Sequence, residues 1–375
     1  MKIIVLGTRG FPDIQGGVEM HCQQLYPELV RLGCEVTVLA REPYVGKQVK
    51  FYQGVQVVPI SCFKNKFLEA FGHTFKGIFA ARRMGCDILH IHAVGPSLFI
   101  PLARFLGLKV VMTNHGPDYQ RKKWGKTAKA ALKLGEYLGS IWANQIICIS
   151  RTIAENIKNQ YGKEAKVIPN GVVLPQVLES NGALKKYGLA GKKYILSVGR
   201  YVPEKGFHDL VKAFNELQIE NYKLVIVGRA DHEDRYSLYL INEASKNANI
   251  VLCGFLSGEP LQELYSHAGL FVLPSYYEGL PIVLLEAMSY GLSCLVSDIP
   301  ANREAGLSED RFFLPGDARA LALKIKEFKD KPLSNEEKKE QRGRVSQRYN
   351  WENIVKKTLE VYNLVILPRQ KSLQN

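Results

Sequence analysis

Two glutamates eight residues apart are the side chains best suited to bind a ligand. Glu278 follows the apolar run 270–275, and Glu286 lies among the apolar residues of 284–288. An unpaired carboxylate on an apolar helix face destabilises a protein, so a capping or surface role fits Glu286 poorly. A carboxylate on a helix can instead accept hydrogen bonds from two vicinal hydroxyls, while a loop carboxylate bonds a second polyol. The spacing predicts a site for a ligand with two hydroxylated groups.

Backbone N–H groups lie between these two carboxylates. The sequence predicts a helix over 281–290, with proline at its first position and Gly291 after its end. The free N–H groups of Leu280, Ile282 and Val283 would then cover a phosphate. The candidate binding residues of this segment are Glu278, Gly279, Leu280, Pro281, Ile282, Val283 and Glu286.

Positive charge is expected at a second junction between a strand and a helix. Arg200 and Lys205 bracket the loop between the run 194–200 and a helix expected over 204–217. A diphosphate would find two cations there, together with the N–H groups of the helix start. Gly199 and Gly206 leave room for a close approach of the ligand, so this loop is a candidate phosphate site.

The first strand, expected over 3–7, leads through a glycine-bearing loop into a helix over 19–32. Gly16 and Gly17 lie just before this helix, where backbone N–H groups meet an anion or a sugar. A plain tight turn is the other interpretation. The loop does not match G-x-G-x-x-G, and the second strand ends at Arg41 rather than at an acid, which disfavours a nicotinamide dehydrogenase.

Three histidines lie near the ends of expected strands. His115 ends the run 109–115, and polar side chains at the carboxyl edge of a parallel sheet point into the crevice that binds ligands. His90 and His92 lie on one face of another strand. With no third ligand nearby in the sequence, they are interpreted as ordinary strand-end histidines rather than a metal site.

Short β-branched runs alternate with longer amphipathic stretches along the whole chain, a pattern typical of parallel α/β sheets. After a polar gap over 176–193 the pattern restarts, which predicts two Rossmann-like halves. The expected strands are 3–7, 35–40, 55–60, 87–92, 109–115, 145–150, 166–171, 194–200, 223–228, 250–254, 270–275 and 293–298, with a last helix over 351–366. We expect no signal peptide and no membrane-spanning segment. The seven scattered cysteines are expected to be reduced core residues.

The net charge of +14 is concentrated in one half of the chain. Residues 1–170 contain 23 Lys and Arg against 11 Asp and Glu. Such a field attracts anionic lipid or nucleic acid, although a solvated helix face is the simpler interpretation. Phenylalanines recur at 63, 67, 71 and 75, either as part of a core or as a stripe that enters a membrane interface. The candidate membrane-binding cations are Arg121, Lys122, Lys123, Lys126, Lys129 and Lys133.

Taken in order, these motifs resemble the retaining nucleotide-sugar transferases of glycosyltransferase family 4, which have the GT-B fold. The resemblance covers nearly the whole chain. The opening segment 9–12 is similar to members that build bacterial surface polysaccharides. The segments that carry the resemblance are 16–19, 113–116, 168–172, 199–206, 274–288, Ser297-Asp298 with Glu304, and 349–351.

The resemblance implies an α/β protein of two facing Rossmann-like domains with an active-site cleft between them. Residues 1–173 and 351–375 would form the acceptor-binding domain, with the last helix crossing back to it, and residues 174–350 would bind the nucleotide-sugar. The implied activity is transfer of a hexosyl or deoxyhexosyl group from a nucleotide-diphosphate donor to a glycan or lipid-linked acceptor. The enzyme is expected to be cytoplasmic. If it binds lipid, it would lie on the inner face of the cytoplasmic membrane.

The same resemblance implies roles for the candidate residues. Arg200 and Lys205 would hold the donor diphosphate, Glu286 the ribose hydroxyls and Glu278 the transferring sugar. His115 would contact the donor sugar near its C6 oxygen, while Gly16 and Gly17 would form the acceptor and phosphate loop, with Gly17 also contacting the donor. No metal and no cofactor are expected.

Two other classes of function are less consistent with the sequence. A sugar-nucleotide epimerase of GT-B fold would lack the spacing of Glu278 and Glu286. A basic protein that binds nucleic acid is disfavoured because no RNP, KH or helix-turn-helix pattern accompanies the charge, so no nucleic-acid partner is expected. A basic membrane-binding protein is the other alternative of this class, and the cation cluster alone would be enough for that function. The residues do not identify the donor base, the sugar or the acceptor.

Overall fold

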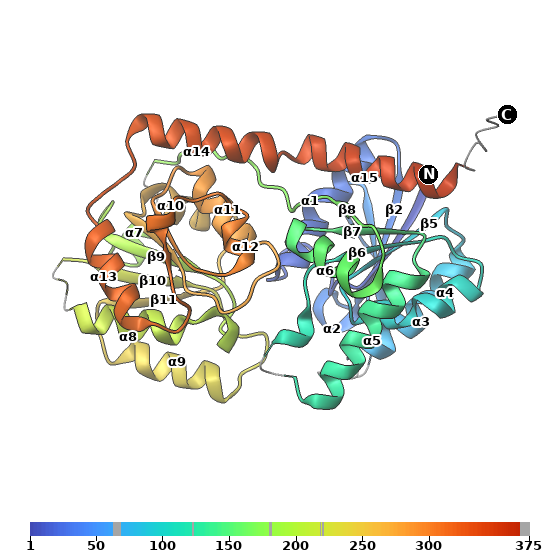
Figure 1. Ribbon diagram of the computed structural model, residues 1–375, viewed down its shortest axis with the longest axis horizontal. Coiled ribbons are helices and arrows are strands. Elements are labelled where there is room, and N and C mark those ends of the chain that lie inside the picture. Colours follow the sequence, from blue (N-terminus) through green and yellow to red (C-terminus); the bar gives the residue numbers. More distant parts are fainter. Residues whose placement is uncertain (63–68, 122–123, 180–181, 218, 220, 368–375) are drawn as a thin grey trace. The chain divides into compact units, whose positions relative to one another are not determined.

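The computed structural model describes residues 1–62, 69–121, 124–179, 182–217, 219 and 221–367 (Figure 1). The chain folds into two compact units, Met1–Asn170 together with the segment from Trp351, and Gly171–Asn350. The first boundary therefore lies after Asn170 rather than after residue 173. The reason is local, because the backbone N–H of Val172 donates to the carbonyl of Tyr349 within the second unit.

The first unit is built on a sheet with the strand order β3-β4-β2-β1-β5-β6-β7-β8. Every neighbouring pair is parallel except β3 with β4. The strands β2, β3 and β4 lie on one side of β1, and the later strands β5 to β8 lie on its other side. The strands are β1 (Lys2–Leu6), β2 (Glu35–Arg41), β3 (Lys50–Tyr52), β4 (Val55–Ile60), β5 (Ile88–His92), β6 (Val110–Asn114), β7 (Gln145–Cys148) and β8 (Lys166–Val167).

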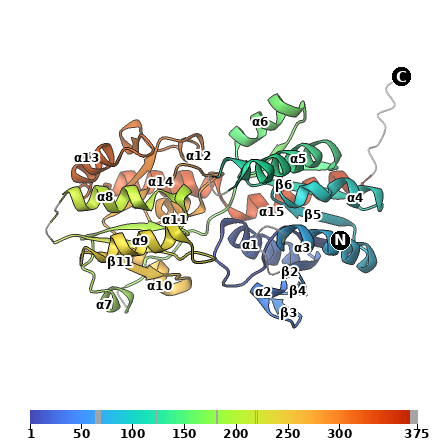
Figure 2. The same ribbon diagram turned by 90° about the horizontal axis from the view of Figure 1, so that it is seen from below.

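Helices cover both faces of this sheet (Figures 1 and 2). Alternate side chains of the strands pack against α1 and α15 on one face and against α3 and α4 on the other, which follows from the period of two in a strand. The helices are α1 (Gly17–Arg31), α2 (Glu42–Val45), α3 (Glu69–Met84), α4 (Ile100–Phe105), α5 (Lys126–Trp142), α6 (Arg151–Tyr161) and α15 (Trp351–Ile366), with 3₁₀ turns at Pro96–Phe99 and Asp118–Gln120.

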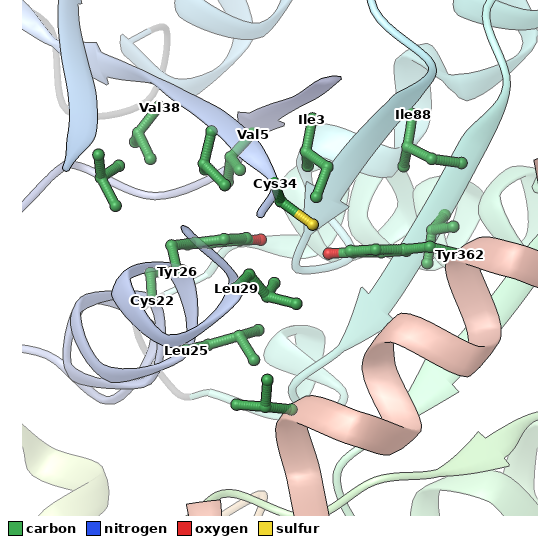
Figure 3. Packing of buried hydrophobic residues seen from close by; sticks show 14 of the residues in the cluster. Ile3, Val5, Cys22, Leu25, Tyr26, Leu29, Cys34, Val38, Ile88 and Tyr362 are labelled. Atoms are coloured by element: carbon green, nitrogen blue, oxygen red, sulfur yellow. The ribbon is translucent and has the colours of Figure 1, made fainter. Parts of the chain in front are cut away.

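The last helix closes the core of the first unit. Figure 3 shows Tyr362 of α15 pointing across the core toward Tyr26 of α1, with the strand residues Ile3, Val5 and Ile88 around them. Both tyrosines are completely buried. The C-terminal segment is thus part of the first unit, as the resemblance implied.

The second unit contains a wholly parallel sheet with the order β11-β10-β9-β12-β13-β14. Its strands alternate with helices along the chain. The strands are β9 (Tyr194–Val198), β10 (Lys223–Val227), β11 (Ile250–Gly254), β12 (Leu270–Leu273), β13 (Cys294–Ser297) and β14 (Phe312–Phe313); the helices are α7 (Ala183–Lys186), α8 (Phe207–Leu217), α9 (Arg235–Ser245), α10 (Gly258–His267), α11 (Ile282–Ser289), α12 (Pro300–Arg303), α13 (Ala318–Phe328) and α14 (Asn335–Arg348), with 3₁₀ turns at Pro203–Lys205 and Glu309–Arg311.

Three helix starts differ from the sequence-based prediction. Helix α1 begins at Gly17, two residues early, and α11 begins at Ile282 with Pro281 as its N-cap. Helix α8 begins at Phe207 rather than at residue 204, because Gly206 adopts a left-handed conformation with φ of 66° and interrupts the turn. Strands β3 and β14 were not predicted.

All seven cysteines are free, and Cys22, Cys34, Cys148 and Cys294 are buried as expected, whereas Cys62, Cys86 and Cys253 are only partly buried and are not core residues. Within the described ranges, no helix is long and apolar enough to cross a membrane.

Candidate functional site

In the second unit, the candidate residues follow β9 and β12, the neighbouring strands at which the order of the strands reverses. Strand β9 pairs with β10 on one side and with β12 on the other. The loop after β9 carries Arg200 and Lys205, and the loop after β12 carries Glu278. Parallel strands end at the same edge of a sheet, and such switch points are where open α/β sheets bind ligands.

Lys205 and Glu278 form an ion pair at this edge. The Nζ of Lys205 lies 2.6 Å from Oε1 of Glu278, which also accepts from Ser275 Oγ at 2.6 Å. Their side chains are only 16% and 10% exposed. Two candidate residues far apart in the sequence are therefore in contact, and each neutralises the other in the free protein.

Gly206 makes this contact possible in a way the sequence did not indicate. A Cβ at this position would lie 2.1 Å from the carbonyl oxygen of Pro274. The backbone N–H of Tyr276 also donates to the carbonyl of Glu204 at 2.9 Å. Gly206 thus allows the two loops to pack backbone to backbone, rather than leaving open space for a ligand.

Arg200 is held separately from the Lys205 pair. Its Nη1 lies 2.7 Å from Asp231 Oδ2, in the loop after β10, and both side chains remain about one-fifth exposed at 19% and 23%. Asp231 was not among the predicted residues, because it lies in an ordinary-looking charged stretch. The carboxylate fixes the guanidinium at the same edge of the sheet.

Glu286 lies in α11 with a neutral partner. The hydroxyl of Tyr265 donates to Glu286 Oε2 at 3.0 Å. Burial raises the pKa of the Glu286 carboxyl to about 7, against the smaller effect of the tyrosine hydrogen bond. The sequence predicted the glutamate, but nothing in its pattern pointed to Tyr265. A carboxylate held this way has unused acceptor capacity for hydroxyl groups.

The start of α11 offers backbone donors close to these side chains in the sequence. Within the described chain, no side chain caps this helix, and the N–H groups of Leu284 and Leu285 already turn back to the carbonyl of Pro281. Ile282 and Val283 supply the first N–H groups of the helix, which carry its positive dipole end. This end can hold an anion.

In the first unit, the glycine loop is fixed by a buried ion pair. Glu19 accepts from the backbone N–H of Arg9 at 3.0 Å and from its Nη2 at 3.1 Å. A Cβ on Gly16 would lie 2.0 Å from the carboxylate of Glu19, so this position requires glycine. A Cβ on Gly17 would meet no described atom within 4 Å, which leaves the first turn of α1 open to a ligand.

His115 follows β6 and contacts other histidines. Its Nε2 lies 2.9 Å from Nδ1 of His92, and its ring lies 5.3 Å from that of His21. Burial lowers the pKa of His115 to about 3, so the ring is neutral at physiological pH. His21, which the sequence did not single out, also stays neutral, because burial lowers its pKa to about 3.

The histidines do not form a metal centre in the described chain, where no group of three His, Cys, Asp or Glu side chains is placed to hold a metal ion. His90 and His92 are fully buried and bonded to tyrosine hydroxyls instead. They are more than strand-end residues, because they connect His115 to the core.

The predicted membrane-binding surface is only partly described. Lys122, Lys123, Phe63 and Phe67 lie outside the described residues. Arg121 pairs with Asp118 at 2.8 Å and Lys129 is half-buried, whereas Lys126 and Lys133 of α5 are exposed. The stripe on α3 is not core, since Phe71, Phe75 and Phe79 are 49%, 44% and 45% exposed.

Helices α4 and α5 are neighbours of α3 (Figure 2), and they carry further exposed apolar and basic side chains. Phe105 of α4 is 89% exposed and Trp142 of α5 is 50% exposed. Together with Pro101, Leu102 and Arg104 they line a hollow of about 510 Å³. Lys76, Arg82 and Arg83 on α3 are exposed as well. Aromatic and cationic side chains therefore occur together on α3, α4 and α5.

Comparison with known proteins assigns both units to one kind of enzyme. The family Glycosyltransferase Family 4 matches residues 15–175, and Glycosyl transferases group 1 matches residues 183–362. The chain belongs to glycosyltransferase family 4. It is 28% identical to an uncharacterized glycosyltransferase of Methanocaldococcus jannaschii, over 98% of this chain and 99% of the relative.

The glycosyltransferase is also similar to two characterised proteins. It is 30% identical to the UDP-Gal:alpha-D-GlcNAc-diphosphoundecaprenol alpha-1,3-galactosyltransferase of Escherichia coli, over 58% of this chain and 59% of that protein. The crystal structure of Anabaena HepE in complex with UDP-glucose superposes with a TM-score of 0.77 and 19% identity, covering 96% of this chain and 99% of that one. The fold is GT-B, as the resemblance predicted.

Proposed function

We propose that this glycosyltransferase moves a hexosyl or deoxyhexosyl group from a nucleotide-diphosphate sugar to a glycan or lipid-linked acceptor during surface polysaccharide synthesis, with retention of configuration. The observation that carries the proposal is the Lys205–Glu278 pair, at the switch point of the second sheet, with Glu286 on the following helix. The similar galactosyltransferase acts, by its name, on a diphosphoundecaprenol-linked sugar. The similar HepE structure contains UDP-glucose.

In the proposed complex, the donor diphosphate replaces Glu278 as the partner of Lys205. The freed carboxylate of Glu278 can then accept hydrogen bonds from the transferring sugar. Arg200, already fixed by Asp231, adds a second cation, and the N–H groups at the start of α11 complete the anion site. The ribose hydroxyls donate to Glu286.

The first unit is proposed to supply the acceptor site and one contact to the donor sugar. Gly17 leaves the start of α1 open, where backbone N–H groups can meet a phosphate or an acceptor hydroxyl. His115, a neutral imidazole, can exchange a hydrogen bond with a sugar oxygen. In this proposal the leaving phosphate helps to deprotonate the acceptor on the same face of the sugar, which produces retention.

Titration calorimetry on purified variants tests the donor site. Glu286→Gln and Lys205→Ala should each weaken binding of the matching nucleoside diphosphate, chosen from UDP, GDP and dTDP, by about 10- to 100-fold, the effect of losing one charged hydrogen bond. Glu259→Gln and Lys212→Ala change exposed residues of the same unit and should leave the affinity unchanged. Unchanged affinity in both site variants would refute this donor site.

Product analysis separates the proposed reaction from its alternative. With a nucleotide-sugar and a lipid-linked acceptor, a transferase forms a glycoside and releases the nucleoside diphosphate. An epimerase of the same fold converts the nucleotide-sugar without any acceptor. Isomerised donor as the only product would therefore contradict the proposal.

We further propose that the first unit binds the anionic surface of a membrane through α3, α4 and α5. Exposed Phe71, Phe75 and Phe79 lie on the same helix as exposed Lys76, Arg82 and Arg83, a combination typical of interfacial helices. Lys126 and Lys133 extend the positive charge to α5. This arrangement would place a cytoplasmic enzyme on the inner leaflet, beside a lipid-linked acceptor.

A further inference from the structure

A continuous line of hydrogen-bonding groups runs from His115 into the core of the first unit. His115 Nε2 lies 2.9 Å from Nδ1 of His92, and His92 Nε2 lies 2.5 Å from the hydroxyl of Tyr26. That hydroxyl lies 3.0 Å from Nδ1 of His90, which is also 2.6 Å from the hydroxyl of Tyr362. His90 Nε2 meets Thr113 Oγ1 at 2.7 Å. These groups come from α1, β5, β6 and α15.

Burial fixes the number of protons that each histidine of this line carries. It lowers the pKa of His90, His92 and His115, so each ring is neutral and carries one proton. Each ring nitrogen is therefore either a donor or an acceptor, and never both. The pattern of contacts then restricts which nitrogen carries the proton.

The competition between two tyrosine hydroxyls at His90 decides the outcome. If Nδ1 of His90 is an acceptor, it has one lone pair, and Tyr362 at 2.6 Å is better placed to donate than Tyr26 at 3.0 Å. If Nδ1 carries the proton, it cannot accept from Tyr26 at all. In either case the ring nitrogen nearest to the Tyr26 hydroxyl is Nε2 of His92, at 2.5 Å, and the proton of Tyr26 is assigned to this short contact rather than to the hydroxyl of Tyr362, which also hydrogen-bonds with Tyr26.

The positions of the protons on His92 and His115 follow from this contact. His92 accepts at Nε2, so its proton is on Nδ1, and this N–H donates to Nε2 of His115. We propose that Tyr26 and His92 act as positioning residues that hold the proton of His115 on Nδ1, so that His115 offers a sugar oxygen a neutral hydrogen-bond donor. The identity of the ligand rests on the proposed function, whereas the position of the proton is a property of the free protein.

A neutral donor suits a hydroxyl or ring oxygen better than it suits a phosphate. A fixed tautomer also costs no reorganisation when the ligand arrives, which is how preorganised donors contribute to catalysis. Tyr26, His92 and their neighbours thus tune His115 without contacting the substrate.

Nitrogen-15 NMR of the full chain, labelled at histidine and free of ligand, tests the proposal directly. The protonated and unprotonated nitrogens of a neutral imidazole resonate at different positions, and the signals of His115 are assigned by their loss in His115→Asn. We expect His115 to be protonated at Nδ1. A wild-type spectrum with the proton of His115 on Nε2 would overturn the proposal, and the only variant that this result needs is the His115→Asn protein used for the assignment.

Two conservative variants in the line give opposite expectations. Tyr26→Phe removes the donor to His92, and the ratio of the two His115 tautomers should shift about tenfold toward Nε2–H, the effect of one lost hydrogen bond. Thr113→Val removes the hydroxyl that pairs with His90 Nε2, so the proton of His90 is expected on Nδ1 in this variant. Tyr26 still donates to His92, and His115 should keep its proton on Nδ1. Identical His115 spectra in Tyr26→Phe and wild type would refute the proposal.

Steady-state kinetics provide a second readout that general destabilisation would not reproduce. In Tyr26→Phe, kcat should fall in proportion to the loss of Nδ1-protonated His115, with an unchanged KM for the donor, and in Thr113→Val both should stay near wild type. If the NMR result holds but no nucleotide-sugar is turned over, the proposed function fails and the assignment of the proton stands. If activity is present and the tautomer does not follow Tyr26, the assignment fails alone.

Discussion

At the scale of single residues, the two glutamates of the second unit differ in what neutralises them. Glu278 has a cation at 2.6 Å, whereas the partner of Glu286 is a neutral tyrosine hydroxyl at 3.0 Å. The charged form of Glu286 is therefore less favoured in the free protein than that of an ordinary glutamate. Its carboxylate gains the most from ligand hydroxyls that donate to it.

This difference predicts an unusual dependence of stability on pH. Burial raises the pKa of Glu286 to about 7 from an ordinary 4.5, so between these values the folded protein binds more protons than the unfolded one. The free energy of unfolding of the wild type should fall relative to Glu286→Gln as the pH rises from 4.5 to 7, by at most about 3 kcal/mol. Urea denaturation of both proteins at pH 5 and pH 8 measures it. A constant difference between them would show that this carboxyl is not perturbed.

The candidate residues were easier to predict than their partners. Glu278, Glu286, Arg200 and Lys205 lie at strand ends and helix starts, and these positions can be recognised from local hydrophobic patterns. Their partners Tyr265 and Asp231 become neighbours only through the fold, and tyrosine in an amphipathic helix carries no signal of its own. His90 and His92 looked ordinary for the same reason, because their contacts to α1 and α15 join distant parts of the chain.

At the scale of elements, the junction of the loops after β9 and β12 depends on one glycine. Gly206 has φ of 66°, and an added Cβ would lie 2.1 Å from the Pro274 carbonyl oxygen. Gly206→Ala should therefore lower the free energy of unfolding by about 1–3 kcal/mol and weaken nucleoside diphosphate binding, because Lys205 is displaced.

Gly343→Ala in α14 is the matched control for that variant. An added Cβ there meets no described atom within 4 Å, and alanine is the better helix former, so stability should rise by about 0.5–1 kcal/mol. Thermal and urea denaturation with calorimetric titration measure both effects. A Gly206→Ala protein as stable as wild type, with full affinity, would contradict this account of the junction.

The start of α11 leads to a prediction about metal ions. Arg200, Lys205 and the first N–H groups of α11 provide positive potential at the proposed diphosphate site, the role that a divalent ion fills in other transferases. Turnover should therefore persist in excess EDTA. Loss of activity on chelation and its recovery with manganese would show that these groups are insufficient.

Among the elements, the longer buried strands were predicted, and two short edge strands were missed. Runs such as 194–200 and 223–228 are apolar because helices cover both faces of the sheet. Strand β3 has two exposed residues and one partly buried residue, and β14 has only two residues, so neither produces a hydrophobic run. The start of α8 was misplaced because the conformation of Gly206 is set by Pro274, distant in the sequence.

At the scale of the whole molecule, the charge is divided unequally. Residues 171–350 contain 23 basic and 23 acidic residues, so the net charge of +14 belongs entirely to the rest of the chain, which is the first unit. Each cation near an anionic surface contributes about 1 kcal/mol. The first unit alone should therefore determine attachment to lipid.

Flotation with phosphatidylglycerol vesicles tests this division of charge. Changing Lys76, Arg82, Arg83 and Lys126 together to Glu should abolish flotation at low salt, and wild type should also be released at high salt because such charges are screened over about 10 Å. The control changes four exposed cations of the second unit to Glu, namely Lys212, Arg319, Lys326 and Lys339. Equal flotation of the two variants would disprove the membrane surface.

The return of α15 to the first unit has a consequence for how the protein is made. On the ribosome, where synthesis runs at about 5–20 residues per second, the second unit emerges as one uninterrupted stretch and has all its residues once Asn350 is out. The first unit begins to emerge earlier, yet the place beside Tyr26 stays empty until Tyr362 arrives. The nascent chain must carry an unfinished apolar core for the whole of that interval, so the part synthesised first is the part finished last.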